Sequence, residues 1–343
     1  MNYKLFIQGF NMQANQEPPH IQLAIMSRWY VVSRAIHTVA KLGLANHMSF
    51  KPMKVNDLAQ MTDTNPELLN RLLRFLSAYA IFKHENDTYS LTELSVPLRD
   101  DAPNSIRAVL CMVDESWWQA FSCLDLSLKT GVSSFTLQHG DDFFSYLSKH
   151  PEKQGNFDKG MAKLSTFDDD AIAQAYDFSA FSTMIDLGGG RGGLVKALAK
   201  NYPHLQISLF DTPAVIEQLD TTDFPSQVQL VSGDFLAHVP KAEAYIFKGV
   251  LHDFNDDLML QILNNCCKQI PKEAILFIAE QVLPEDDLPH PNKTMDIVMM
   301  ALLGGRQRTI KEWQKSVEPA GFRYLDCYKT NTLFTLMAFR PNK

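Results

Sequence analysis

Cysteine is scarce in this sequence, and positive charge does not dominate it. Only five of the 343 residues are cysteines, and no two of them form a C-x-x-C pair, so the spacing indicates neither a disulfide framework nor a metal site. We therefore expect a reducing compartment, the cytoplasm. The formal net charge is −7, which gives no general attraction to nucleic acid or to acidic membranes, and we expect neither as a partner.

Long apolar runs are absent as well. No stretch has about 20 uninterrupted apolar residues, which argues against a membrane-spanning helix. Residues 1–9 contain neither a long apolar segment nor a small-residue cleavage site, so we expect no signal peptide. What is present is an ordinary globular composition, 45% hydrophobic and 21% charged, in a chain long enough for two domains. We place these domains at residues 1–170 and 171–343.

Apolar residues in the first part of the chain recur at helical spacing. Residues 20–48 are expected to form one long amphipathic helix or two short ones. Two further helices are expected at 53–60 and 65–79, with Asn65 placed to cap the second. Two short strands around a polar turn follow at 80–92. Helix, helix and hairpin in this order are typical of a winged helix.

A winged helix can bind DNA, so one interpretation of the chain is a DNA-binding regulator with a ligand-sensing domain. The second helix carries five leucines but only two cations, Arg71 and Arg74. Phosphate binding needs several cations on one face. The interpretation that we favour is therefore a buried structural role or a dimer interface.

The second part of the chain alternates short β-type runs with helical segments. Residues 105–130 and 140–178 are still expected to be helical, and βα units follow from residue 183. Such units predict an α/β, Rossmann-like fold, in which a parallel sheet has helices on both faces. Two final strands with no helix between them predict an antiparallel hairpin at the sheet edge. The expected strands are 183–187, 206–211, 228–231, 244–248, 275–280, 324–328 and 333–339, with helices at 192–201, 256–269 and 309–319.

A glycine-rich loop joins the first of these strands to its helix in the run Asp186-Leu-Gly-Gly-Gly-Arg-Gly192, which contains Gly188 and Gly190. Glycine permits close approach of the backbone to a ligand, and ligands bind at the carboxyl ends of strands in such sheets. By itself, the run also fits the dinucleotide pattern. Asp211 suits either cofactor, because an acid about 20–25 residues after the loop can hold ribose hydroxyls.

Three features favour S-adenosylmethionine over a dinucleotide. Asp186 stands directly before the loop, where a carboxylate would repel a pyrophosphate but suits a sulfonium amino acid. Asp234 and Phe235 follow the third strand, and they offer a carboxylate for the adenine amine and a ring for stacking. The closing hairpin is not a usual ending of a dehydrogenase.

These residues, together with the run Lys248-Gly-Val-Leu-His-Asp-Phe-Asn-Asp256, resemble the small-molecule O-methyltransferases. That family includes plant caffeate and flavonoid enzymes, acetylserotonin methyltransferase and bacterial polyketide methyltransferases. The resemblance covers nearly the whole chain, and it implies a class I methyltransferase domain preceded by a mainly helical, winged-helix-like dimerisation domain. It also implies a homodimer and S-adenosylmethionine as the cofactor.

The same resemblance assigns contacts with the cofactor to individual residues. Ser165 matches a position that can also reach the cofactor, and Asp186 and Gly190 of the loop complete the expected set. The positions that the family uses directly correspond to Gly188, Asp211, Asp234, Phe235 and Lys248.

His252 is the candidate general base. It follows the fourth strand at the carboxyl edge of the sheet, and a histidine pKa near neutrality suits proton removal from a hydroxyl nucleophile. Asp253 is adjacent to it, and Glu280 ends the next strand, so a carboxylate is available to fix the imidazole tautomer. The resemblance assigns His252 as the base and Glu280 as the acid that orients it.

The sequence departs from the family at Gln307. The family usually has a second glutamate in a Gly-Gly-x-Glu-Arg-Thr motif, whereas this chain has Gln307 at that position. An amide carries no charge and stabilises an imidazolium less than a carboxylate does. An alternative function is therefore a same-fold, cofactor-binding enzyme that performs hydroxylation, decarboxylation or pericyclic chemistry.

The predicted function is methylation of a hydroxyl group on an aromatic or polyketide-like small molecule, in secondary metabolism. Leu164 replaces a histidine that contacts the substrate in the plant phenolic enzymes, which argues against a hydroxycinnamate. By resemblance, the residues that line the substrate pocket are Trp118, Phe157, Met161, Met299, Met300 and Leu303.

Overall fold

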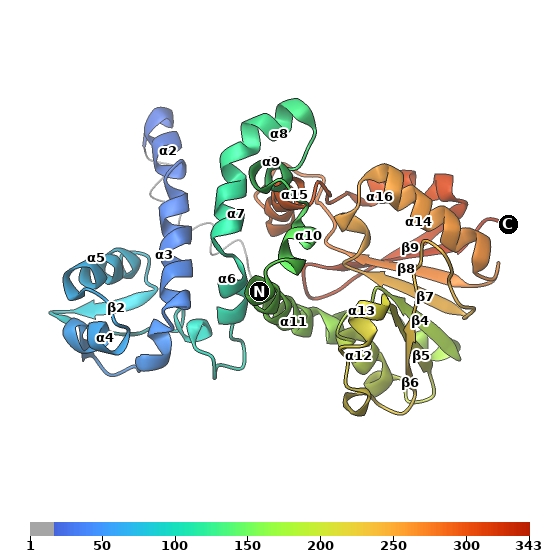
Figure 1. Cartoon of the computed structure of the whole chain (residues 1–343), viewed down its shortest axis with the longest axis horizontal. Helices are drawn as coiled ribbons and strands as arrows, with labels where there is room; N and C mark the ends of the chain where they lie inside the picture. The colour runs from blue at the N-terminus through green and yellow to red at the C-terminus, as the bar shows by residue number, and fades with distance from the viewer. Residues whose placement is uncertain (1–16) are drawn as a thin grey trace. The chain divides into compact units, whose positions relative to one another are not determined.

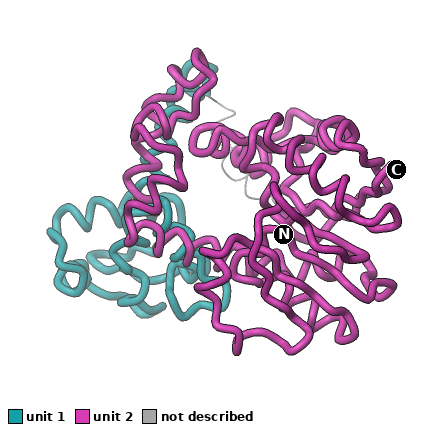
Figure 2. Tube along the Cα trace, turned by 45° about the vertical axis from the view of Figure 1, so that its right-hand side comes forward, with its two compact units in different colours: residues 1–113 teal, residues 114–343 magenta. Residues whose placement is uncertain are grey.

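The computed structural model describes residues 17–343, and the chain divides into two compact units, residues 1–113 and residues 114–343 (Figure 2). Residues 1–9, for which no signal peptide is expected, lie outside the described residues. The division after residue 113 differs from the domain boundary predicted at residue 170. Packing explains the difference, because the helical segment 115–173 packs against helices that follow it in the chain.

The N-terminal unit is mainly helical and contains a small antiparallel sheet. The segment 20–48 forms two helices separated at Ser27 and Arg28, followed by a short 3-10 turn. Asn65 acts as the predicted cap, since its Oδ1 accepts a hydrogen bond from the backbone N–H of Leu68 at 3.1 Å. The elements of this unit are α2 (Pro19–Met26), α3 (Trp29–Lys41), β1 (Met53–Lys54), α4 (Val55–Met61), α5 (Pro66–Ser77), β2 (Phe82–Glu85), β3 (Thr88–Leu91) and α6 (Arg107–Met112).

The predicted hairpin is β2 and β3, and β1 pairs with β3 as a third strand. β1 has only two residues, too few to show a periodicity in the sequence. Most leucines of α5 build the core of the unit: Leu69, Leu73 and Leu76 are buried, while Leu68 is 58% exposed. The structural role favoured for this helix is therefore confirmed for its buried face.

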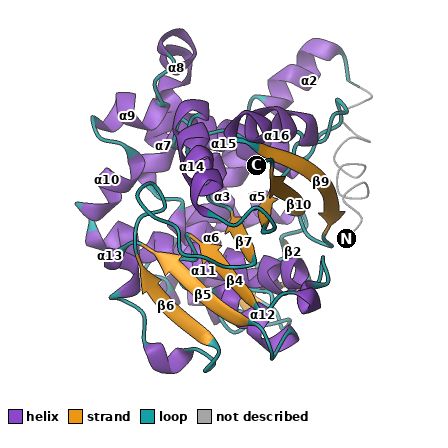
Figure 3. Ribbon diagram, turned by 90° about the vertical axis from the view of Figure 1, so that its right-hand side faces the viewer, coloured by secondary structure: helices purple, strands orange, loops and turns teal. Residues whose placement is uncertain are grey.

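A seven-stranded sheet forms the centre of the C-terminal unit (Figures 1 and 3). Its strands are β4 (Thr183–Leu187), β5 (Gln206–Asp211), β6 (Val228–Ser232), β7 (Ala244–Lys248), β8 (Ile275–Glu280), β9 (Phe322–Lys329) and β10 (Thr335–Pro341). The order across the sheet is β6-β5-β4-β7-β8-β10-β9. The first five are parallel, and β10 is antiparallel to both β8 and β9. The predicted parallel sheet with a closing hairpin at its edge is confirmed.

Helices cover both faces of this sheet. The helices of this unit are α7 (Glu115–Ala120), α8 (Leu124–Thr130), α9 (Ser134–His139), α10 (Phe143–Ser148), α11 (Pro151–Ala173), α12 (Gly193–Asn201), α13 (Pro213–Ile216), α14 (Asp256–Gln269), α15 (Pro291–Leu302) and α16 (Ile310–Val317). Of these, α11, α12, α14 and α16 contribute buried residues to the apolar clusters on the two faces. Neighbouring strand residues point to opposite faces, so Ile185 joins an apolar cluster with α14 and α16, whereas Met184 joins one with α11 and α12. Because β4 to β8 are parallel, their carboxyl ends lie along one edge of the sheet.

Three helices of this unit, α9, α13 and α15, lie outside the predicted helical segments. In α15, two polar residues that break the apolar pattern point inward. The Nδ2 of Asn292 donates hydrogen bonds to the carbonyl oxygens of Val282 and Leu333, and Oδ1 of Asp296 accepts one from the backbone of Gln307. No helix of residues 17–343 combines the length and the apolar character needed to cross a bilayer.

Candidate active site

The loop between β4 and α12 requires glycine. Gly188, Gly190 and Gly192 have φ angles of +76°, +54° and +75°, a region that other residues rarely adopt. At Gly192, a Cβ atom would also lie 2.4 Å from Cε1 of Phe224. Because α12 begins directly after the loop, its first backbone N–H groups lack intrahelical partners and can bind a ligand.

Asp186 lies under this loop and is almost fully buried. Its exposed fraction is 2%, and its Oδ1 has no hydrogen-bond partner among residues 17–343. Burial raises the pKa of Asp186 to about 7, an effect that the ammonium of Lys248 opposes. A buried carboxylate oxygen without a donor indicates a position where a ligand supplies one.

Three further predicted residues lie at the end of β5 or shortly after β6. Asp211 is fixed to the glycine loop, because its Oδ2 accepts a hydrogen bond from the backbone N–H of Gly190 at 2.9 Å. Asp234 is exposed, and its Oδ1 accepts a hydrogen bond from the N–H of Leu236 at 2.8 Å. The ring of Phe235 is partly buried, and it contacts the ring of Phe247 edge-on at 5.7 Å between centroids.

Lys248 at the end of β7 is held by two side chains of α11. Its Nζ donates hydrogen bonds to Oγ of Ser165 and to Oδ1 of Asp169. The side chains of Lys248 and Asp169 are only 11% and 8% exposed. The structure thus brings the predicted Ser165 and Lys248 together, and it adds Asp169, which sequence reasoning missed. The available signal was the spacing of Ser165 and Asp169, four residues apart on one face of a helix.

His252 and Glu280 form a direct pair. The distance from Nδ1 of His252 to Oε2 of Glu280 is 2.6 Å, and Glu280 is completely buried. The other oxygen of Glu280 accepts hydrogen bonds from the backbone N–H groups of Leu251 and His252, at 3.1 and 3.4 Å. On the opposite side of the ring, Nε2 of His252 lies 3.2 Å from Oδ1 of Asp253. The three residues predicted to be catalytic are therefore in contact.

The charges of these residues shift one another's proton affinity. Burial lowers the pKa of His252, but the carboxylates of Glu280 and Asp253 outweigh burial and raise this pKa to about 9. Burial raises the pKa of Asp253 to about 6, against the opposing effect of His252. Both ring nitrogens face carboxylates, which is the arrangement expected of a positively charged imidazolium.

The loop of residues 304–309 packs against the backbone of His252. The N–H of Arg306 donates a hydrogen bond to the carbonyl oxygen of His252 at 3.1 Å. A Cβ atom on Gly305 would lie 2.1 Å from that same oxygen, so this position has no room for a side chain. Gln307 follows in the loop and is 1% exposed. Within the described part of the chain, its Oε1 has no hydrogen-bond partner.

The residues predicted to line the substrate pocket lie on three helices and the turn after one of them. Phe157 and Leu303 pack on an apolar cluster with Phe135 and Phe143, whereas Met161 is 43% exposed. α15 packs against α7 and α9, which brings its methionines toward the helix that carries Trp118. By location, Trp118 is on α7, Phe157 and Met161 are on α11, Met299 and Met300 are on α15, and Leu303 directly follows α15.

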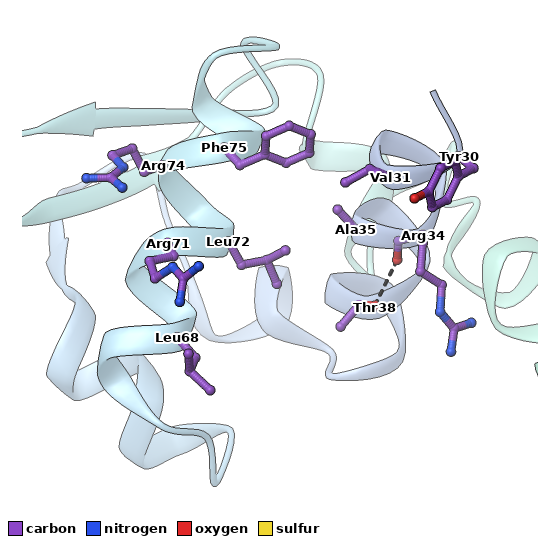
Figure 4. A pocket seen from close by; sticks show the side chains of 10 residues that line it. All are labelled: Tyr30, Val31, Arg34, Ala35, Thr38, Leu68, Arg71, Leu72, Arg74 and Phe75. Carbon is purple, nitrogen blue, oxygen red and sulfur yellow. Dashed lines mark hydrogen bonds between the residues drawn. The ribbon is translucent and has the colours of Figure 1, made fainter. Parts of the chain in front are cut away.

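A separate groove of about 770 Å³ lies in the N-terminal unit (Figure 4). It contains none of the predicted site residues. Leu72 and Phe75 extend from α5 toward α3 in this view. The groove is lined by Tyr30, Val31, Arg34, Ala35 and Thr38 of α3 and by Leu68, Arg71, Leu72, Arg74 and Phe75 of α5.

Comparison with family models covers most of the chain. Residues 121–323 match an O-methyltransferase domain, and residues 25–99 match an O-methyltransferase dimerisation domain. The chain belongs to the O-methyltransferase family.

Individual relatives agree with this assignment. The phenazine O-methyltransferase PhzM of Lysobacter antibioticus is 32% identical, over 96% of this chain and 99% of that protein. The 3-amino-4-hydroxybenzoate 4-O-methyltransferase of Streptomyces cremeus is also 32% identical, over 89% and 86% of the two chains. Among solved structures, the methyltransferase CalO1 of calicheamicin biosynthesis, in its SAH-bound form, is 29% identical with a TM-score of 0.84. That match covers 94% of this chain and 98% of CalO1.

This O-methyltransferase uses S-adenosylmethionine, the cofactor of its family. The residues present fit that cofactor. Asp186 provides a buried acceptor without a donor, Lys248 provides a cation, and the glycine loop leaves no side chain between the backbone and a ligand. Carboxylates can pair with the positive charges of the sulfonium and ammonium groups. The carboxylates of Asp211 and Asp234, near the ends of β5 and β6, can accept hydrogen bonds from a nucleoside.

Proposed function

We propose that this enzyme methylates a hydroxyl group of an aromatic or polyketide-like small molecule, with His252 as the general base. The names of the relatives support the substrate class, since one acts on a phenazine and another on 3-amino-4-hydroxybenzoate. Leu164, in place of the histidine of the plant phenolic enzymes, argues against a hydroxycinnamate.

The contact of His252 with Glu280 is the observation that carries the proposed base. A carboxylate at Nδ1 fixes the proton on that nitrogen, so the neutral ring presents Nε2 as its acceptor. Glu280 keeps this orientation because backbone N–H groups hold its second oxygen. In the base form, Nε2 releases its contact with Asp253, and the substrate hydroxyl takes that place.

When bound, S-adenosylmethionine supplies a methyl group on a sulfonium sulfur. The residues of this chain align the substrate hydroxyl with that methyl group, and His252 accepts the proton of the hydroxyl. Alignment of two reactants contributes roughly 7–11 kcal/mol, and a positioned base contributes about 10²–10⁴-fold in rate. Glu280 and Asp253 stabilise the imidazolium that forms on His252.

For the cofactor, each assignment follows the chemistry of the residue. We assign the ribose hydroxyls to Asp211, the adenine amine to Asp234 and the adenine face to Phe235. Gly188 and Gly190 allow the backbone to approach, and the amino-acid end lies at Asp186, Lys248 and Ser165.

For the substrate, we assign an apolar pocket to residues of α7, α11 and α15. Methionine adapts its shape to the ligand, which suits a planar ring system. The proposed lining comprises Trp118, Phe157, Met161, Met299, Met300 and Leu303.

The test of this function is a product analysis. The enzyme is incubated with cofactor labelled at the methyl carbon and with a panel of hydroxyphenazines, hydroxybenzoates and naphthols. We expect label on an oxygen of one compound and an equal amount of S-adenosylhomocysteine. Conversion of a compound without release of S-adenosylhomocysteine would instead support the non-methylating alternative raised by Gln307.

We also propose a homodimer formed through the N-terminal unit. The match to the dimerisation domain and the apolar groove between α3 and α5 support it. Three exposed apolar side chains line that groove: Tyr30, Val31 and Leu68. Leu23 and Ile25 of α2 and Trp29 of α3 are exposed as well. A second copy of the chain would remove these side chains from water.

A further inference from the structure

Carboxylates crowd around Lys248 at the edge where the amino-acid end of the cofactor is placed. Asp169 contacts the ammonium directly. Asp168 and Asp186 lie close enough to Lys248 to interact with its charge. One ammonium therefore faces three carboxylates, two from α11 and one from β4.

Asp169 is built into the fold rather than placed on its surface. Its neighbour Asp170 has a side chain that is 55% exposed and pairs with Lys200, whereas the side chain of Asp169 is 8% exposed. A Cβ atom on Gly193 would lie 2.0 Å from Oδ2 of Asp169. The absence of a side chain at the first residue of α12 thus lets Asp169 pack against that helix.

The charges of this cluster are not balanced by the side chains that face it. Besides Lys248, Asp169 faces Ser165 and Asp170, and Asp168 faces Thr332. Asp186 also interacts electrostatically with a further acid of the site, Asp211. Burial raises the pKa of Asp168 and of Asp169, and it raises that of Asp186 to about 7.

A second observation indicates that a ligand completes the cluster. Asp186 is 2% exposed, it interacts with Lys248 and Asp169, and its Oδ1 has no hydrogen-bond partner in residues 17–343. Buried carboxylates are normally paired with cations or saturated by donors. A cationic ligand with N–H donors would supply both the compensating positive charge and the missing hydrogen bond.

We propose that Asp169 is a further cofactor-binding residue, which acts with Asp186 to bind the positive charges of S-adenosylmethionine in preference to S-adenosylhomocysteine. The inference rests on the proposed position of the amino-acid end at Asp186 and Lys248. S-adenosylmethionine carries a sulfonium, an ammonium and a carboxylate, whereas the product has lost the sulfonium charge. Lys248 can pair with the carboxylate of either ligand. Asp169 and Asp186 can pair with the cationic groups.

The consequence for turnover follows from the charge difference. A negatively charged cluster attracts a ligand of net charge +1 more strongly than one of net charge zero. Transfer of the methyl group removes the attraction that held the cofactor, and release of the product becomes easier. Asp169 and Asp186 thus favour the replacement of bound S-adenosylhomocysteine by S-adenosylmethionine.

Proton linkage gives this proposal a pH signature. The cationic ligand binds best when the carboxylates are ionised, so below their pKa the binding releases protons. Affinity for S-adenosylmethionine is therefore expected to rise as the pH increases through about 7, the pKa of Asp186, and then to level off. Affinity for S-adenosylhomocysteine is expected to rise less.

Calorimetric titration of the full chain at pH 6, 7 and 8 tests the proposal without turnover. The ligands are S-adenosylmethionine, S-adenosylhomocysteine and sinefungin, an analogue with an amine in place of the sulfonium. We expect Asp169→Asn to weaken the two cationic ligands roughly tenfold, the equivalent of one pKa unit, and the product much less. Asp170→Asn is the matched control, and it should leave all three affinities unchanged.

Equal loss for all three ligands, or no loss, in Asp169→Asn would overturn the proposal. Asp186→Asn provides a second variant if Asp169→Asn does not fold, as judged by circular dichroism. Asp211→Asn separates this inference from the cofactor site itself, because a ribose contact affects the three ligands alike. If Asp211→Asn weakens the binding of all three ligands and Asp169→Asn weakens none, the cofactor site stands and the charge preference assigned to Asp169 is wrong.

Discussion

Glu280 and Asp186 are both buried carboxylates at the same edge of the sheet, but their surroundings differ. Glu280 is saturated by the ring of His252 and by two backbone N–H groups. Asp186 retains an oxygen without a partner among residues 17–343. A saturated carboxylate fixes the position of its neighbour, whereas an unsaturated one is available to a ligand. The two residues therefore suit different tasks in one site.

The raised pKa of His252 predicts how activity depends on pH. Because this pKa is about 9, most of the free enzyme carries an imidazolium at neutral pH, and kcat/KM should rise until the pH reaches about 9. In Glu280→Gln, the loss of the carboxylate lowers the pKa of His252. The rising limb should then move to lower pH while the plateau of kcat falls.

A pH–rate profile from pH 6 to 10 measures both effects, with Glu285→Gln as the control. Glu285 is also a glutamate, but its side chain is 52% exposed and pairs with Lys311. If the rising part of the kcat/KM profile of Glu280→Gln stays at the same pH, Glu280 does not set the proton affinity of His252.

At the residue scale, sequence reasoning identified groups whose position follows from the end of a strand. His252 follows β7 and Glu280 ends the neighbouring parallel strand β8, so their proximity is predictable. Asp169 is different, because an acid on a helix normally faces water, whereas this one packs against Lys248 and Gly193. The unpartnered oxygen of Gln307 likewise depends on the path of a loop rather than on any local pattern.

At the scale of elements, the loop of residues 304–309 links α15 to His252. Arg306 binds the backbone of His252, and the N–H of Gln307 binds Asp296 on α15. Arg308 is fully buried and pairs with Asp256 at the start of α14. The loop therefore holds His252 between two helices.

Gly305→Ala should disturb this arrangement. The new Cβ atom would lie 2.1 Å from the carbonyl oxygen of His252, so the loop must shift. We expect a loss of about 1–3 kcal/mol in the free energy of unfolding, as for other overpacked sites, together with a lower kcat. Urea denaturation and initial rates measure the two effects.

The matched control is Gly155→Ala on α11, where a Cβ atom has no neighbour within 4 Å among the described residues. Alanine is favoured over glycine inside a helix by roughly 0.5–1 kcal/mol, so this variant should be at least as stable as the parent. Equal stability of the two variants would mean that the loop adapts without cost.

Elements with a regular period were predictable, and those shaped by tertiary contacts were not. The strands β4 to β8 appear where expected, and of these β7 and β8 have uninterrupted apolar runs. Helix α15 was missed because Asn292 and Asp296 point inward to hold other segments. The boundary predicted at residue 170 also differs from the division of the structure after residue 113. The packing of α11 on α12 cannot be recognised from the composition of α11.

At the scale of the whole molecule, the proposed homodimer predicts the effect of a charge in the groove. Val31→Asp places a carboxylate at a residue of α3 that is 40% exposed and lines the groove. A buried, unpaired charge is costly, so we expect this variant to have the mass of a single chain at micromolar concentration. Light scattering after size-exclusion chromatography measures the mass.

Met61→Asp on α4 is the control for this experiment. Met61 is 51% exposed and is not among the residues that line the groove. It should retain the mass of two chains. A parent protein with the mass of one chain would contradict the proposed homodimer directly.

The most direct test of the proposed mechanism is the rate of methyl transfer by His252→Ala, with the substrate found in the panel and S-adenosylhomocysteine as the readout. We predict that kcat falls by about 10²–10⁴-fold, the usual contribution of a general base, while the affinity for S-adenosylmethionine is unchanged. His204→Ala, at an exposed histidine bound to the carbonyl of Ser179, should retain the parental rate. Methylation by His252→Ala at the parental rate would contradict a catalytic role for His252.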